Sequence, residues 1–271
     1  MSVLSLHHLT MIDAHPLDLI DAAAAGGFSH CGIRLIPPRK GDPFIDVLSD
    51  PTEIPAIGRR LRETGIRLLD IEAVWIASTT DLETLRAPFE VGARLGAEYV
   101  LVVGYDDNRA RLLESFGHVC ELARSLGLKV ALEFITYTSL KTLDEVASFI
   151  KEAAQPDAGM LIDVLQFFRA GCKPEEIAQY DPKLFSYLQI CDGLAQAPVT
   201  IEDRRFEARS NRRLPGRGEL PVSALMHALP RGLPISLEAP TPELNGFEFR
   251  EQGRIAGEAT RTFLSECGVK S

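Results

Sequence analysis

The feature that most restricts the fold of this sequence is a repeated order of helix, glycine and apolar strand. The order recurs in LRETG-IRLLD, GARLG-AEYVL and ARSLG-LKVAL, beginning at residues 61, 92 and 123. Glycine commonly ends a helix, and an apolar run directly after it is typical of a buried strand. Strands that alternate with helices predict an α/β fold with a parallel sheet.

The same alternation continues through the whole chain. We predict strands at 3–9, 31–36, 67–72, 98–103, 129–134, 159–163, 185–191 and 234–238, and helices at 16–25, 52–64, 82–95, 109–126 and 142–154. Eight strand units in 271 residues favour a single (β/α)8 TIM barrel, with one domain over 1–271. A doubly wound open sheet is the alternative, but the turn after the first strand, MIDAHPLD, contains no glycine-rich phosphate loop.

Composition limits the partners and the compartment. The net charge of −9 gives no basic footprint, so we expect no nucleic acid partner. The five cysteines form no C-x-x-C pair, which is typical of a reduced protein. The start, MSVLSLHHLT, does not resemble a signal peptide, and no apolar run is long enough for a bilayer. We therefore expect a cytoplasmic protein without a membrane partner.

Four oxygen-bearing side chains stand at the ends of the last four predicted strands. They are Glu133, Asp163, Gln189 and Glu238. One such acid alone is as often a salt-bridged side chain as a ligand, and a buried carboxylate is costly unless it is paired or coordinates a cation. Parallel strands of a barrel bring their carboxyl ends together on the face where active sites lie. The set therefore predicts a site for one hard divalent ion.

Other candidates lie at the same predicted face. His8 and Glu72 end the first and third strands, and either could line a substrate pocket. The longest irregular stretch, 192–219, contains six arginines, and loops of this length are usually functional. Most of these arginines fit a solvated loop or a subunit contact equally well, and the acidic surface permits a homodimer or higher homo-oligomer.

Five motifs carry a resemblance to a known family. They are ALEF around Glu133, LIDVLQFFRAG around Asp163, YLQICDG around Gln189, RLPGRGELP at 213–221 and SLEAP around Glu238. Together they resemble the xylose isomerase-like TIM-barrel superfamily, which includes ketose 3-epimerases, hydroxypyruvate isomerase and inosose and 3-dehydroshikimate dehydratases. The resemblance implies that the four strand-end residues bind the metal. An all-oxygen set favours Mn²⁺ or Mg²⁺, with Co²⁺ or Zn²⁺ as alternatives.

The resemblance also implies a chemistry. The ion would polarise a carbonyl and stabilise the enediolate formed when a neighbouring carbon loses its proton. Glu133 and Glu238 correspond to the paired acid/base residues of the ketose epimerases. We assign substrate contacts to Gln166, to Glu72 and His8, and to Arg209 and Arg212, which precede the Pro215-Gly216 turn that similar proteins place near the metal.

Some positions depart from the family pattern. Gln166 stands where many members have histidine, and Ile135 stands where some dehydratases have a catalytic histidine. With six histidines and a net charge of −9, the chain does not fit endonuclease IV. We therefore predict a metal-dependent isomerase or epimerase of a keto-sugar or a similar small polyhydroxy carbonyl compound. A lyase with the same enolate chemistry is the first alternative, and a non-catalytic carbohydrate-binding barrel is the second.

Overall fold

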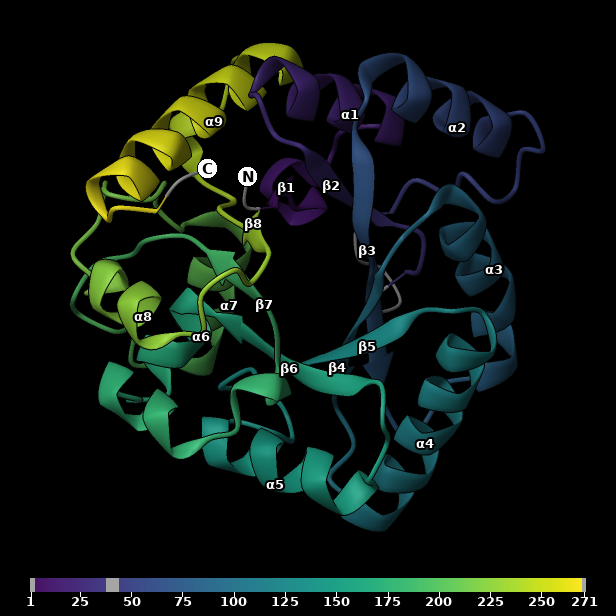
Figure 1. The fold of residues 1–271 in the computed structure, drawn as a ribbon, viewed down its shortest axis with the longest axis vertical. Coiled ribbons are helices and arrows are strands. Elements are labelled where there is room, and N and C mark those ends of the chain that lie inside the picture. Colours follow the sequence, from purple (N-terminus) through teal and green to yellow (C-terminus); the bar gives the residue numbers. More distant parts are fainter. Residues whose placement is uncertain (1–2, 38–43, 270–271) are drawn as a thin grey trace.

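A computed structural model describes residues 3–37 and 44–269, so both ends of the predicted domain 1–271 lie outside the described residues. Eight strands pair in chain order, all parallel, and β8 pairs with β1 to close a barrel (Figure 1). This confirms the predicted (β/α)8 fold. The strands are β1 (Leu4–Leu6), β2 (His30–Arg34), β3 (Arg67–Ile76), β4 (Tyr99–Gly104), β5 (Lys129–Glu133), β6 (Ala158–Asp163), β7 (Phe185–Ile190) and β8 (Ile235–Leu237).

The helices lie outside the strands, and the last one packs beside the first (Figure 1). Apolar side chains of strands and helices meet between the two layers and form the main core. The helices are α1 (Pro16–Ala25), α2 (Glu53–Thr64), α3 (Arg86–Leu95), α4 (Arg109–Ser125), α5 (Leu143–Ala153), α6 (Val164–Arg169), α7 (Ile201–Ser210), α8 (Val222–Ala228) and α9 (Phe249–Glu266).

Glycine ends α2 and α3 as the sequence predicts. Gly65 and Gly96 cap these helices with φ of 75° and 87°, a left-handed conformation that side chains with a Cβ rarely adopt. The predicted helix at 82–95 is divided, because a 3₁₀ turn, η2 (Leu82–Leu85), precedes α3.

Other predicted segments also differ from the structure. The strand expected at 3–9 ends at Leu6, because the chain turns into a 3₁₀ helix, η1 (His8–Met11). The stretch 192–219, expected to be irregular, contains α7, whose N-cap Thr200 accepts a hydrogen bond from the Asp203 backbone nitrogen at 3.0 Å. The cap satisfies a free N–H group at the start of α7, a helix with few apolar residues.

The barrel interior has an apolar part and a polar part. A small apolar cluster from β3 to β7 includes Leu101, Leu161 and Tyr187. Towards the carboxyl ends of the strands, the buried side chains are polar or charged: His7, Glu72, Glu133, Asp163, Gln189 and Glu238. Within the described part of the chain, no helix has both the length and the apolar character needed to cross a membrane.

Candidate functional site

The four predicted metal ligands lie on neighbouring strands at one end of the barrel. Glu133 and Asp163 end β5 and β6, Gln189 is the penultimate residue of β7, and Glu238 directly follows β8. Asp163 is paired in register with Gln189, and Gln189 with Ser236. All four side chains are buried. The closed sheet thus brings together residues that are up to 105 positions apart in the sequence.

The three carboxylates form a compact group. Glu133, Asp163 and Glu238 each offer an oxygen, and these oxygens lie within 4.8 Å of one another. Neither polar atom of the Gln189 amide has a hydrogen-bond partner among residues 3–37 and 44–269. A buried amide without a partner is costly, and a cation bound by its oxygen would remove part of that cost. The donor set therefore fits a hard divalent ion.

Arg212 lies between two of these carboxylates. Its Nη1 donates to Asp163 Oδ2 at 2.5 Å, and its Nη2 lies 3.0 Å from Glu238 Oε2. The other oxygen of Asp163 accepts from the Gln166 backbone nitrogen at 2.8 Å and caps α6. The predicted Arg212 is thus a fully buried cation beside the carboxylate group.

Two buried anchors, which sequence reasoning did not single out, hold the segment that carries Arg212. Asp192 accepts hydrogen bonds from the backbone of Gly193, Gly216, Gly218 and Leu220, and its own backbone pairs with Arg213. Arg169 donates to Glu207 at 2.6 and 2.8 Å and so ties α7 to α6. The motifs ICDG and QFFRAG contain Asp192 and Arg169, but the sequence does not reveal what these residues contact.

A histidine connects the carboxylate group to a second acid. His7 Nδ1 lies 3.2 Å from Glu238 Oε1, and its Nε2 lies 3.1 Å from Glu72 Oε1. Arg34 Nη2 donates to the other Glu72 oxygen at 3.2 Å. Glu72, His7 and Arg34 are all buried and all line the same pocket as Glu133 and Glu238.

The pocket above the carboxylates contains most of the predicted substrate contacts. Gln166 lines it and is fixed through its amide oxygen, which accepts from the backbone nitrogen and hydroxyl of Thr136 at 3.1 and 3.2 Å. Arg209 and Arg212 line it from α7 and the segment after it. Its less polar walls are Leu9, Ala73, Trp75, Leu101, Val103, Ile135, Tyr137 and Ala208.

His8 does not line this pocket. Its Nδ1 accepts from the Arg34 backbone nitrogen at 2.9 Å, and its Nε2 lies 3.0 Å from the Ala14 carbonyl oxygen. Both ring nitrogens are therefore used to hold the backbone. His7 lines the pocket in place of His8, because β1 ends at Leu6, three residues before the predicted end of the strand at residue 9.

Comparisons with known proteins agree with this architecture. The xylose isomerase-like TIM barrel family matches residues 20–266. The chain belongs to this family. No protein in the curated set matches the sequence.

Solved structures share the fold at low sequence identity. A xylose isomerase-like TIM barrel/4-hydroxyphenylpyruvate dioxygenase fusion protein has a TM-score of 0.78 and 17% identity, covering all of this chain but only 45% of the fusion protein. The IolI protein with a bound zinc atom has a TM-score of 0.74 and 18% identity over 98% of both chains. A D-allulose 3-epimerase from Methylomonas sp. has a TM-score of 0.70 and 17% identity over 98% of both chains.

Burial makes Glu133 and Glu238 weaker acids than usual when no cation is bound. Burial, and then the charge of Asp163, raises the pKa of Glu133 well above its usual range. Burial likewise raises the pKa of Glu238, although the charge of Arg212 opposes the shift. A carboxyl group with a raised pKa holds a proton more readily and so can act as an acid as well as a base.

We expect His8 to stay neutral well into the acidic range. Burial lowers its pKa from 6.5 to about 4. The unfolded chain binds this proton below pH 6.5 and the folded protein does not, so the stabilisation from neutral His8 is complete above pH 6.5. It falls as the pH drops towards 4, by about 3 kcal/mol in all. In an NMR titration the His8 ring signals should not shift between pH 8 and 5, and a midpoint near 6.5 would contradict this prediction.

Proposed function

We propose that this protein is a divalent-metal-dependent isomerase or epimerase that acts on a keto-sugar or a related small polyhydroxy carbonyl compound. The observation that carries the proposal is the group of three buried carboxylates, Glu133, Asp163 and Glu238, of which Glu133 and Glu238 line the pocket. Buried acids brought this close repel one another unless a cation or protons neutralise them. The named relatives include ketose 3-epimerases, which supports this substrate class.

Glu133, Asp163, Gln189 and Glu238 would hold the ion, which we expect to be Mn²⁺ or Mg²⁺. When bound, the ion supplies a Lewis acid that polarises the substrate carbonyl and offsets negative charge on its oxygen. The unpartnered Gln189 amide and the all-oxygen donor set support this assignment.

In this proposal, Glu133 and Glu238 move the protons. They come from β5 and from the end of β8, three strand positions apart around the barrel, so they approach the pocket from different sides. One carboxylate takes a proton from the carbon beside the carbonyl, and the other returns a proton to that carbon or its neighbour. His7 orients Glu238 through its Nδ1 contact of 3.2 Å.

The pocket walls would select a small polyhydroxy ligand. Gln166 keeps its amide oxygen on Thr136, so its NH₂ group remains to donate to a substrate oxygen. Arg209 offers a guanidinium group that can bind hydroxyl, carboxylate or phosphate oxygens, whereas the Arg212 guanidinium is held by Ala208, Asp163 and Glu238. Trp75 packs edge-on against Tyr105, with ring centroids 5.4 Å apart, and presents a rigid aromatic wall. The apolar side chains that line the pocket limit the access of water to the reacting carbon.

The test is isotope exchange in D₂O. Metal-stripped protein reloaded with Mn²⁺ is incubated with a panel of ketohexoses, ketopentoses and keto-acids, and deuterium at carbon is followed by NMR. We expect exchange with formation of an isomer or epimer, and no exchange in the metal-stripped protein or in Asp163→Asn. An enone product with loss of water would replace the proposal with the lyase alternative. Ligand-induced thermal stabilisation without exchange would indicate the non-catalytic barrel.

The remaining expectations stay predictions. They are a cytoplasmic location, a small-molecule substrate without a nucleic acid or membrane partner, and assembly into a homodimer or higher homo-oligomer.

A further inference from the structure

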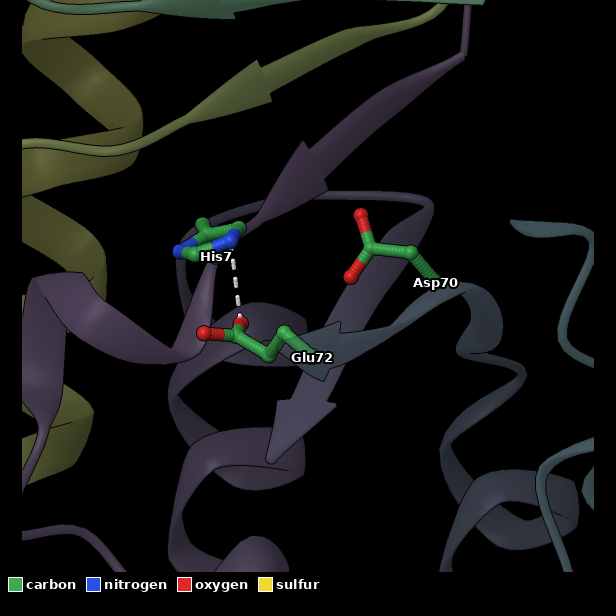
Figure 2. Close-up of side chains that lie close together, drawn as sticks. All are labelled: His7, Asp70 and Glu72. Atoms are coloured by element: carbon green, nitrogen blue, oxygen red, sulfur yellow. Dashed lines mark ion pairs between the residues drawn. The ribbon is translucent and has the colours of Figure 1, made fainter. Parts of the chain in front are cut away.

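A second group of buried ligand-type side chains lies beside the proposed metal site. His7, Asp70 and Glu72 each offer one ligand atom, and these atoms lie within 4.8 Å of one another. Figure 2 shows the Asp70 carboxylate pointing towards the His7 ring and the Glu72 carboxylate, which come from the end of β1 and from β3. The proposed function above uses no atom of Asp70.

Strand periodicity explains why this group is inside the barrel. Side chains two residues apart on a strand lie on the same face. Asp70 precedes Glu72 by two residues, just as Ser5 precedes His7, Tyr187 precedes Gln189 and Ser236 precedes Glu238. These four residues form a lower interior layer, and each is 0% exposed. Barrel interiors are usually filled with branched apolar side chains, so a polar layer at this depth needs a physical cause.

The atoms of this lower layer lack protein partners. Within the described residues, neither oxygen of Asp70 has a hydrogen-bond partner, and the same holds for the hydroxyls of Ser5, Tyr187 and Ser236. Each unpartnered buried polar atom destabilises the fold, and an unpartnered carboxylate does so more strongly. Gly32 on β2 leaves the space that Asp70 occupies, because an added Cβ would collide with Asp70 Oδ1. The fold therefore makes room for a buried carboxylate beside the Tyr187 hydroxyl, which opposes the rise that burial causes in the pKa of Asp70 but is not placed in hydrogen-bond geometry.

The geometry of His7 and Glu72 fits a shared cation. Glu72 Oε2 is taken by Arg34 Nη2, so Glu72 Oε1 remains for the cluster. His7 Nε2 lies 3.1 Å from that Oε1. Two ligands held about 2.1 Å from one ion at a right angle are about 3.0 Å apart.

The other nitrogen of His7 suits the same role. A histidine that binds metal through Nε2 carries its proton on Nδ1 and usually donates it to a carboxylate or carbonyl. His7 Nδ1 has Glu238 Oε1 at 3.2 Å, with the Leu9 backbone nitrogen also at 3.2 Å. Nδ1 accepts from the Leu9 backbone nitrogen, and metal binding at Nε2 would place the proton on Nδ1 and direct it towards Glu238.

The balance of buried charges in this region also indicates a cation at the second group. Five buried carboxylates, those of Asp70, Glu72, Glu133, Asp163 and Glu238, face the two buried guanidinium groups of Arg34 and Arg212. One divalent ion at the Glu133 site leaves a single negative charge without a counterion. Asp70 accepts no hydrogen bond among the described residues and lies outside the first site, so we assign the remaining charge to the second cluster.

We propose that His7, Asp70 and Glu72 bind a second divalent transition-metal ion, adjacent to the site formed by Glu133, Asp163, Gln189 and Glu238. One imidazole and two carboxylates suit Mn²⁺, Fe²⁺ or Zn²⁺ better than Mg²⁺ or Ca²⁺, which prefer oxygen alone. The second site rests on its own residues and not on the proposed reaction. Through His7 it contacts Glu238, so an ion there would hold this carboxylate in one orientation.

The experiment measures Mn²⁺ bound per chain. Protein stripped with a chelator is equilibrated by dialysis against Mn²⁺ and analysed by elemental mass spectrometry, and electron paramagnetic resonance reports spin coupling between neighbouring ions. We expect about two ions in wild type and about one in Asp70→Asn, with loss of the coupling. Asp106→Asn is the control, because Asp106 is also an aspartate of low exposure and pairs with Arg111 outside the cluster, and it should keep both ions.

A second variant separates the two sites. Asp163→Asn should lose the ion of the first site and keep that of the second. One ion in wild type that is lost in Asp163→Asn but retained in Asp70→Asn would overturn the second site and leave the proposed function intact. The reverse pattern would support the second site and remove the basis of the proposed reaction.

Thermal unfolding checks that Asp70→Asn folds. Without metal, this variant should unfold at or above the wild-type temperature, because it lacks the unpartnered carboxylate. With Mn²⁺, its midpoint should rise less than that of wild type. If Asp70→Asn does not fold, His7→Gln replaces it, and loss of about one ion is expected again. Retention of both ions in His7→Gln would overturn the proposal.

Discussion

Replacing Glu133 by glutamine is expected to lower interconversion of the substrate isomers or epimers by about 10²–10⁴-fold while the metal stays bound. Glutamine keeps an oxygen at the end of β5 but cannot accept the substrate proton. The chain already has an amide among its candidate ligands, at Gln189, so the substitution preserves a donor type that the site contains. Metal content and turnover are measured on the same preparation, so that activity lost with the ion can be distinguished from activity lost with the base.

Glu238→Gln should show a loss of similar size, with a different stereochemical result. If the two carboxylates serve opposite faces of the substrate, each variant should still exchange the proton of one epimer in D₂O and fail with the other. Glu152→Gln is the control, because Glu152 pairs with Arg109 on the surface, away from the pocket. Full activity in both site variants with metal bound would eliminate Glu133 and Glu238 as the acid/base pair.

The sequence predicts the barrel well because its local signals agree with one another. Apolar runs such as YVLVV, and the glycines after α2 and α3, are short-range features that hold in almost any context. The strand ends then follow from periodicity, and this places Glu133, Asp163, Gln189 and Glu238 at one face before any contact is known. The closed sheet brings them together as expected.

Contacts between distant residues could not be predicted in the same way. The difference between His7 and His8 depends on where β1 stops, which is set by η1 and its tertiary contacts. One signal was available: Leu4, Ser5, Leu6 and His7 alternate apolar and polar residues, which places His7 on the face of Ser5. In the sequence, Asp70 resembles any acid in the middle of a strand. Its relation to Gly32 and to the lower layer is shown only by the structure.

Arg212→Met is expected to destabilise the metal-free protein by about 3–5 kcal/mol, because it leaves two buried carboxylates without their counterion. Arg212 is 2% exposed and contacts both Asp163 and Glu238. At this chain length, such a loss lowers the thermal midpoint by about 6–20 °C. Methionine retains most of the apolar stem of arginine, so the change removes mainly the charge and its hydrogen bonds.

Mn²⁺ should reverse much of this loss, because a bound cation neutralises the same carboxylates. The metal-induced rise in midpoint should therefore be larger in Arg212→Met than in wild type. Arg217→Met is the control from the same segment: Arg217 is half-exposed and pairs with Glu243, so a change of at most about 1 kcal/mol is expected. If both variants unfold within about 2 °C of wild type without metal, Arg212 does not stabilise the carboxylate group. If Arg212→Met is strongly destabilised and Mn²⁺ gives no extra rise in midpoint, the substitution acts through packing. The cation site would then lie elsewhere in the barrel.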